Sequence, residues 1–276
     1  MPEDIIVNLS GNAIQTAESV HGQDAPKPEL YDVAWPIKKS NVVIIQSCVP
    51  ANGLPFDEAL EWLKPIHGVY AEKWGYDYMA SSEPVINTED PNFSYAWNKV
   101  PLLKQALNVG YEYAIWIDHD CVIVDFDTAL VDAFDEEGAE IMMCVHPGFP
   151  QQGLYSHFNA GVMMVHNSER TKRFLDLVWE RRYHGPVWFE QDVMNELYSD
   201  FEWMDIVGVM SDKFNSTPNA NQVEDKDVVI AAFHGVGTYN DVNVRLGYMK
   251  QFYELREVEK QIAAVGKEYI DPLAKE

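Results

Sequence analysis

The sequence is poor in cysteine and contains no long apolar run. Its cysteines, Cys48, Cys121 and Cys144, are far apart and form no Cys-x-x-Cys pair. This usage is typical of buried thiols in a reducing compartment and argues against a disulfide framework or a zinc site. No stretch reaches the roughly 18 apolar residues of a membrane helix, and the acidic start lacks the basic region of a secretory signal. We therefore expect a cytoplasmic chain without a membrane span.

Basic residues are also scarce. The chain has 20 Lys and Arg against 44 Asp and Glu, a formal net charge of −24 and a pI of about 4.5. Such a surface repels phosphate backbones and anionic membranes, so nucleic acid is not an expected partner. A local cationic pocket for a phosphorylated small molecule is still compatible with this charge.

The 276 residues, 47% of them hydrophobic, suit one large globular domain. Residues 1–40 are irregular and are expected to form an N-terminal arm that packs on a single domain at 41–276. In that domain strands (42–46, 76–80, 113–117, 140–145, 161–165, 228–233) are expected to alternate with helices (56–74, 95–108, 168–183, 189–198, 244–265). The alternation predicts an α/β fold with a mixed, mainly parallel sheet flanked by helices.

Two acids mark the end of the apolar strand 113–117. Asp118 and Asp120 flank His119. Two carboxylates so close at the end of a buried strand repel each other, and a shared cation relieves that repulsion. If the chain turns at His119, both can bind one Mn²⁺ or Mg²⁺ ion. The alternative is a turn in which the acids only cap backbone amides.

Two further polar segments follow. Asn159 precedes the small residues Ala160 and Gly161, which permit a close backbone approach to a ligand. The same segment can also be a plain turn before a strand. Glu190, Gln191 and Asp192 begin a predicted helix, where free amides and the positive end of the dipole lie, although acids there are often only caps.

A histidine and a lysine complete the candidate set. His234 follows the predicted strand 228–233 and precedes Gly235 and Gly237, and a histidine at such a place can be structural. Lys99 lies on the helix before the strand 113–117. It can be a solvated surface lysine, but in so acidic a protein a lysine beside this site is a natural diphosphate partner. Ser47 ends the strand 42–46, at the edge where ligands of such sheets bind.

Together these segments resemble known sugar transferases. The Asp118-His119-Asp120 triplet resembles the DxD motif of nucleotide-sugar glycosyltransferases of the GT-A fold. The Phe158–Val162 and Glu190–Asp192 segments are similar to those of the retaining lipopolysaccharide galactosyltransferase and glycogenin group (glycosyltransferase family 8). His234–Gly237 resembles the late histidine motif of that group, and Trp97–Lys99 resembles a pattern of the galactosyl- and xylosyltransferases of family 34. The resemblance spans about residues 42–240.

The resemblance implies a GT-A domain, a metal ion and a set of roles. Asp118, Asp120 and His234 are implied to hold Mn²⁺ or Mg²⁺ on the donor diphosphate. The implied catalytic residues are Gln191, Glu190 and Asp192, and the implied donor-binding residues are Ser47, Lys99, Asp118, Asn159, Ala160, Gly161, Gly235 and Gly237. The implied reaction moves a hexose or pentose from a nucleotide-diphosphate sugar, UDP being favoured over GDP-mannose, to a hydroxyl of a carbohydrate or other acceptor with retention of configuration.

The sequence departs from the resembled pattern at two places. The family lysine that follows the histidine is missing, since residues 235–240 contain none, and Lys99 or Arg245 is a candidate substitute. Glu190 stands where the family has Asp. The segments 146–157 and 211–225 are candidate acceptor and nucleotide loops.

Two other functions stay open from the sequence. One is a sugar-nucleotide-binding domain without turnover. The other is a haloacid-dehalogenase-like phosphohydrolase with Asp118 as nucleophile. That class needs a later acidic Gly-Asp motif, and the chain contains no Gly-Asp dipeptide.

Overall fold

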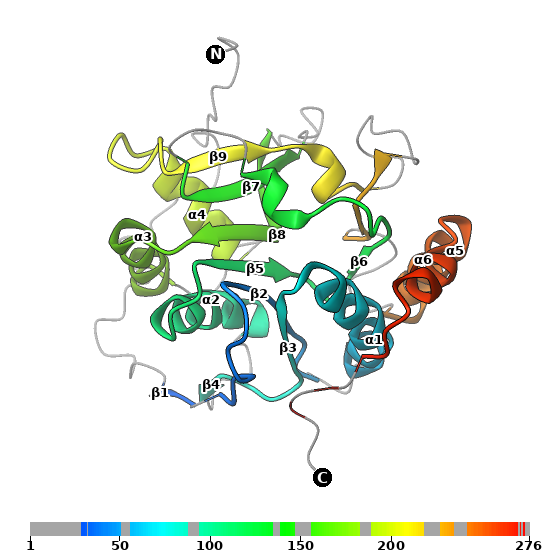
Figure 1. Cartoon of the computed structure of the whole chain (residues 1–276). Coiled ribbons are helices and arrows are strands. Elements are labelled where there is room, and N and C mark those ends of the chain that lie inside the picture. The colour runs from blue at the N-terminus through cyan, green and yellow to red at the C-terminus, as the bar shows by residue number, and fades with distance from the viewer. Residues whose placement is uncertain are drawn as a thin grey trace.

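The computed structural model describes residues 29–31, 33–50, 56–87, 94–134, 139–146, 156–182, 189–217, 227–234, 242–269, 271 and 273. It confirms the expected α/β class, with a mixed central sheet between two layers of helices (Figure 1). Most of the predicted N-terminal arm lies outside the described residues. Its end contributes β1 (Glu29–Leu30), which pairs with β4 (Ile86–Asn87).

Six strands form the central sheet in the order β3-β2-β5-β8-β7-β9. Only β8 runs against its neighbours, because it pairs antiparallel with both β5 and β7, whereas the other pairings are parallel. The carboxyl ends of the parallel strands and the amino end of β8 therefore meet at one edge. The strands are β2 (Val42–Ser47), β3 (Asp77–Ser81), β5 (Tyr113–Ile117), β7 (Ile141–His146), β8 (His157–His166) and β9 (Val207–Met210).

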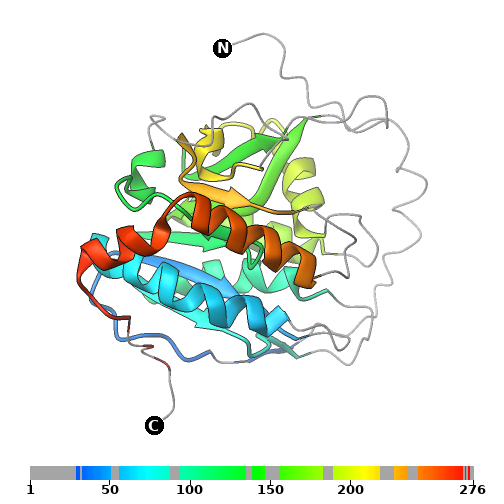
Figure 2. The same cartoon turned by 90° about the vertical axis from the view of Figure 1, so that its right-hand side faces the viewer.

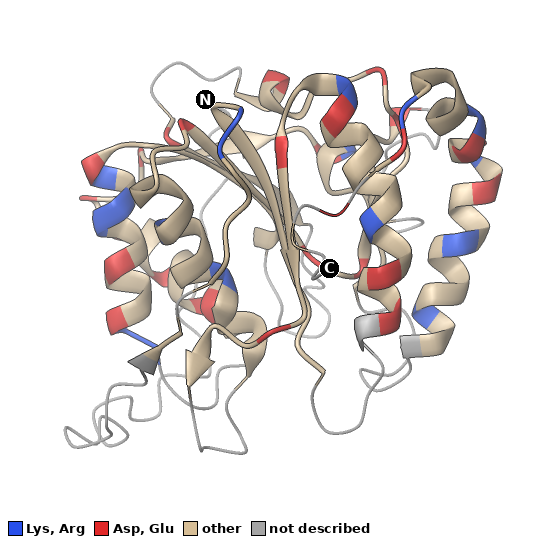
Figure 3. Cartoon of the chain, turned by 60° about the horizontal axis from the view of Figure 1, so that its bottom comes forward, with Lys and Arg blue, Asp and Glu red and all other residues tan. Residues whose placement is uncertain are grey.

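Helices cover both faces of this sheet (Figures 1 and 2). One face carries α1 (Phe56–Trp74), α5 (Val242–Leu255) and α6 (Val258–Val265), and the other α2 (Lys99–Asn108), α3 (Glu169–Glu180) and α4 (Glu190–Tyr198). A separate hydrophobic core lies on each face of the sheet. Along β2, Ile44 packs into the core on the α1 side, and Val43 and Ile45 pack into the core on the α2 side, as the two-residue repeat of a strand requires. Figure 3 shows the charged residues mainly on the helices and few of them on the central strands.

A short antiparallel ribbon lies beside the main sheet. It pairs β6 (Cys121–Ile123) with β10 (Ile230–Ala232). The strand expected at 228–233 is therefore shorter than predicted. The prediction that it joins the main sheet is wrong, because it pairs only with β6 among the described strands. Its pairing brings the chain before His234 to the chain after Asp120, and Phe233 N donates to Asp120 O at 2.9 Å.

The prediction of one continuous helix at 244–265 is wrong, because the chain forms two helices there, α5 and α6. Glu257 takes a left-handed backbone with φ 51° between them. The turn lets Gln261 accept from Phe126 N and donate to Val124 O, and it buries Val258 in the core. The gain of these contacts explains why the charged C-terminal helix packs on the domain. In the 95–108 helix, the first turn is a 3₁₀ segment, η2 (Tyr95–Asn98), before α2.

A glycine of α1 receives an aromatic ring from the chain end. A Cβ on Gly68 would overlap the Tyr269 ring, whereas a Cβ on Gly247 in α5 meets no atom within 4 Å. We predict that Gly68→Ala lowers the free energy of unfolding by about 1–2 kcal/mol, because overpacking exceeds the gain in helix propensity. Gly247→Ala, the matched control, should raise it by about 0.5–1 kcal/mol. Urea denaturation measures both, and a stabilised Gly68→Ala protein would contradict the packing.

Candidate active site

The Asp118-His119-Asp120 segment is a tight turn at the edge where the strand ends meet. Asp118 N donates to Gly161 O at 2.8 Å, which extends the pairing of β5 with β8, and Cys121 N donates back to Asp118 O at 3.1 Å. The side chain of Asp118 is one-third exposed (33%), whereas Asp120 is buried. The turn predicted at His119 is thus present and holds both carboxylates at this edge.

A buried arginine balances Asp120. Arg245 Nη1, on α5, lies 3.1 Å from Asp120 Oδ2. Burial raises the pKa of Asp120, but His119, Arg245 and His234 together outweigh it, so the pKa falls below its usual value. Arg245 Nε is buried and has no hydrogen-bond partner among the described residues. Asp120 is therefore ionised, with a guanidinium as its direct partner.

Two histidines from different parts of the chain stack beside the turn. His234 Nε2 lies 2.8 Å from Thr217 Oγ1 and 3.1 Å from Nδ1 of His146, the last residue of β7. Their ring centroids are 4.6 Å apart. Burial lowers the pKa of both rings, that of His146 to about 3, while Asp120 and then Asp118 favour the charged form of His234. His234 therefore lies in the field of both acids.

These side chains fit a divalent metal in their chemistry. His234 Nδ1 is buried and lacks a hydrogen-bond partner among the described residues. Carboxylate oxygens together with one imidazole nitrogen suit Mn²⁺ or Mg²⁺. As the described side chains lie, no three His, Cys, Asp or Glu residues are close enough to enclose an ion. Arg245 pairs with Oδ2 of Asp120, so an ion bound to that oxygen has to take the place of the guanidinium.

Lys99 joins three of the predicted site residues. It is 2% exposed, and its Nζ lies 2.6 Å from Ala160 O, 2.7 Å from Glu190 Oε1 and 3.4 Å from Asp118 Oδ1. The Trp116 ring lies 5.5 Å from the same ammonium. Burial opposes the charge of Lys99, but Asp118 and Glu190 outweigh it, so the pKa of Lys99 is raised and the side chain stays charged. Lys99 is therefore not a solvated surface lysine, which was the alternative that the sequence left open.

A second network joins β8 to the segment after β9. Asn159 Oδ1 accepts hydrogen bonds from Gly161 N and from Asn215 Nδ2, both at 2.8 Å. A Cβ on Gly161 would lie 2.9 Å from Asn159 Oδ1 and 3.4 Å from Asp118 Oδ2. A side chain at position 161 is thus disfavoured by contacts within the protein, and the expected approach to a ligand stays a prediction.

The first turn of α4 faces β8. Gln191 Oε1 accepts from Ala160 N at 2.9 Å, and Asn195 bonds to both backbone groups of Phe158. Burial raises the pKa of Glu190, with Lys99 opposing and Asp118 adding to the rise. Asp192 follows on the same turn and is partly exposed. These contacts fix the amino end of α4 against the strand that carries Asn159.

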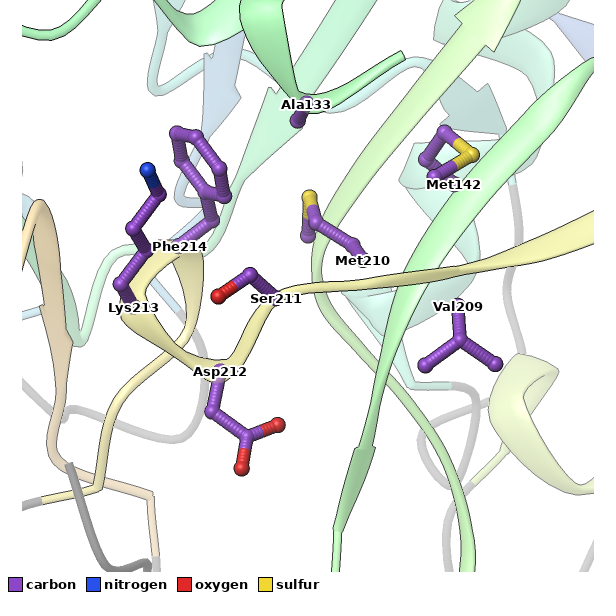
Figure 4. A pocket seen from close by; sticks show the side chains of 8 residues that line it. All are labelled: Ala133, Met142, Val209, Met210, Ser211, Asp212, Lys213 and Phe214. Atoms are coloured by element: carbon purple, nitrogen blue, oxygen red, sulfur yellow. The ribbon is translucent and has the colours of Figure 1, made fainter. Parts of the chain in front are cut away.

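The predicted residues therefore fall into one neighbourhood with some exceptions. Ser47 lies at the same edge and accepts from Asn98 Nδ2 at 3.3 Å. Gly235 and Gly237 lie outside the described residues, as do most of the predicted loops 146–157 and 211–225. A cavity of about 560 Å³ lies beside β9 and the 3₁₀ turn η5 (Asp212–Phe214), and none of the predicted site residues lines it. Figure 4 shows the side chains that line this cavity.

Sequence reasoning gave no role to three side chains of this neighbourhood. His146 and Asn215 had appeared only as members of polar segments, and Asn195 had not been singled out. The usable signal was position, since His146 ends a parallel strand and Asn215 follows another by five residues.

The family of the chain is settled by a sequence comparison. The model of the nucleotide-diphospho-sugar transferase family matches residues 57–249, more than half of the chain. The chain belongs to this family. No curated protein sequence matches it. The described helices include none that is long and apolar enough to cross a membrane.

Solved structures share the fold of this transferase family. A glycosyltransferase involved in the glycosylation of the major capsid of PBCV-1 is 15% identical, with a TM-score of 0.56 over 76% of this chain and 98% of that one. The galactosyltransferase LgtC is also 15% identical, with a TM-score of 0.47 over 78% and 95% of the two chains. Mouse xyloside xylosyltransferase 1 is 12% identical, with a TM-score of 0.43 over 72% and 98%. The GT-A fold expected from the motifs is thereby confirmed.

Removal of the buried ammonium should destabilise the protein in a pH-dependent way. We predict that Lys99→Met costs about 3–5 kcal/mol near pH 8, because Glu190 and Asp118 lose their shared cation. Glu190 then keeps a raised pKa and takes up a proton on folding, so the loss should shrink as the pH falls toward 5.

Guanidinium denaturation at several pH values measures this loss. Lys104→Met is the matched control. Lys104 lies on α2 like Lys99, but it is partly exposed and pairs with the partly exposed Asp176 of α3. It should cost at most about 1 kcal/mol at every pH. Equal losses for the two variants would contradict the role assigned to Lys99.

Proposed function

We propose that this transferase is a metal-dependent enzyme that moves a hexose or pentose from a UDP-sugar to a hydroxyl group of an acceptor, with retention of configuration. The observation that carries the proposal is the position of Asp118, Asp120 and His234 at one edge of the sheet, where the β6–β10 ribbon holds Asp120 beside the chain that leads to His234. Family membership supports the nucleotide-sugar donor. UDP is preferred to GDP-mannose on the resemblance alone.

The proposed metal is Mn²⁺ or Mg²⁺, and Asp118, Asp120 and His234 would hold it. When bound, such an ion supplies Lewis-acid stabilisation of the negative charge on the departing diphosphate. The protein's part is to present two carboxylates and an imidazole nitrogen that has no other hydrogen bond among the described residues.

Arg245 is the better substitute for the missing late lysine. Lys99 is occupied by Ala160 O and two acids, whereas Arg245 has one ion pair and a buried Nε without a partner among the described residues. A guanidinium binds two phosphate oxygens at once. We therefore assign Arg245 to the diphosphate and Lys99 to the positioning of Glu190 and Asp118.

The donor sugar is assigned to Asn159 and the first turn of α4. Because Gln191 Oε1 accepts from Ala160 N, the orientation of its amide is fixed, and Glu190 and Asp192 flank it. In the proposed reaction the bond from C1 to the phosphate oxygen breaks, and the acceptor oxygen bonds to C1 on the same face. The acceptor's proton passes to the departing phosphate oxygen, so no protein nucleophile is needed.

A donor-release assay tests this function. Purified protein is incubated with UDP- and GDP-sugars in Mn²⁺ or EDTA, and free nucleotide is scored. We expect release from one donor, abolished by EDTA and reduced at least about 100-fold in Asp120→Asn. Asp127→Asn, an exposed acid paired with Lys73, is the matched control and should release nucleotide at the wild-type rate.

The alternatives give different outcomes. A domain without turnover would show a metal-dependent thermal shift with a nucleotide sugar but no release. A phosphohydrolase would free phosphate from simple phosphate esters and ignore the sugar panel. Either result would contradict the transferase.

Arg245 should affect metal binding and turnover in opposite directions. We predict that Arg245→Met binds Mn²⁺ more tightly without donor, because no guanidinium competes for Asp120, yet releases nucleotide about 100-fold more slowly. Arg245→Lys should lose less turnover. Calorimetry and the release assay measure the two effects, with the exposed Arg173→Met as control. Weakened Mn²⁺ binding in Arg245→Met would contradict the competition.

A further inference from the structure

The contact between His146 and His234 constrains where their protons lie. Nε2 of His234 and Nδ1 of His146 are 3.1 Å apart. Two ring nitrogens at this distance hydrogen bond only when one carries a proton and the other a lone pair. Neither ring hydrogen bonds to a carboxylate among the described residues, so nothing within hydrogen-bond distance stabilises a second proton, and each ring is a neutral imidazole with one proton.

The carbonyl of Asn215 decides which nitrogen of His146 carries the proton. His146 Nε2 lies 3.4 Å from Asn215 O, and a carbonyl oxygen can only accept. His146 is therefore protonated at Nε2 and has a lone pair at Nδ1. His234 must then donate from Nε2 to His146. Thr217 Oγ1, 2.8 Å from the same nitrogen, then accepts from the same proton, because a protonated ring nitrogen has no lone pair for a hydroxyl.

This chain of hydrogen bonds leaves His234 Nδ1 without a proton. That nitrogen is buried and has no hydrogen-bond partner among the described residues, and His234 lies in the field of Asp120 and Asp118. A proton on Nδ1 would be a buried donor with no acceptor among the described residues, and it would occupy the lone pair that a metal ion needs.

We propose that His146 is a positioning residue, which fixes His234 in the tautomer whose Nδ1 lone pair is available to a divalent cation. The proposal rests on the function proposed above. His146 is not expected to touch the ion. Its contribution is a hydrogen-bond acceptor at Nδ1, supplied from the end of β7 and oriented by the backbone of Asn215.

The chain offers a pair of variants that separate this acceptor from simple packing. His146→Asn can place its amide oxygen where Nδ1 lies, whereas His146→Leu fills similar space without an acceptor. We expect Mn²⁺ binding to the full chain, followed without nucleotide by the EPR signal of free Mn²⁺, to weaken about 10–100-fold in His146→Leu. His146→Asn should stay within a few-fold of wild type. Melting temperatures check that each variant is folded.

A direct measurement on the unaltered protein covers the case in which the leucine variant does not fold. Long-range ¹⁵N–¹H correlation spectra of histidine-labelled, metal-free protein report the tautomer of each ring. We expect His234 protonated at Nε2 and not at Nδ1, and the same state in His146→Asn.

The outcomes separate the two proposals. Wild-type affinity in His146→Leu, equal losses in the Leu and Asn variants, or a proton on His234 Nδ1 would overturn the role of His146 and leave the metal-dependent transferase standing. Absence of Mn²⁺ binding to wild type, together with nucleotide release in EDTA, would overturn the metal site itself and the role of His146 with it.

Discussion

The ammonium of Lys99 is the interaction on which the site's arrangement depends. Lys99 is only 2% exposed, and burial of a charged ammonium to this extent costs free energy of folding unless hydrogen-bond acceptors surround it. Here they come from three separate elements, the carbonyl of Ala160 on β8, Glu190 on α4 and Asp118 after β5. The same charge therefore fixes the distances between β8, the first turn of α4 and the Asp118-His119-Asp120 turn.

The charges around this site do not balance. Asp118, Asp120 and Glu190 face two basic side chains, Lys99 and Arg245. One way to lessen the deficit is protonation of Glu190, whose pKa is raised by burial. Another is an added cation. Among the described residues, the excess of negative charge at this edge of the sheet is thus a physical reason for the metal ion proposed above.

Much of the fold could be predicted from sequence because its signals are local. The strand predicted from the β-branched run at 42–46 appears as β2, one residue longer, and the helix at 56–74 appears where the pattern places it. The break between α5 and α6 could not, since Glu257 has no local preference for a left-handed turn and is held there by distant contacts of Gln261.

The candidate site likewise has some residues with a local sequence signal and others that only distant contacts bring into place. Asp118 and Asp120 were visible because acids that end an apolar strand are unusual. Arg245 had been named only as an alternative, and His146 and Asn215 looked ordinary. Their proximity depends on the crossing of strands far apart in sequence, above all on the reversed direction of β8. A lysine buried among acids likewise looks identical in sequence to one on a helix surface.

The β6–β10 ribbon has a consequence for folding fidelity. Its residues are buried on both sides, so the alternation of apolar and polar residues does not define its register. The register is defined by backbone bonds at its margins, where Ser216 bonds to Ile230 and Ala232, and Phe233 bonds to Asp120. A slip of one residue would keep an apolar ribbon but turn His234 to the opposite face. Misfolded molecules of this kind would retain much of the native compactness and lack the site, so the active fraction of a preparation is a quantity distinct from its folded fraction.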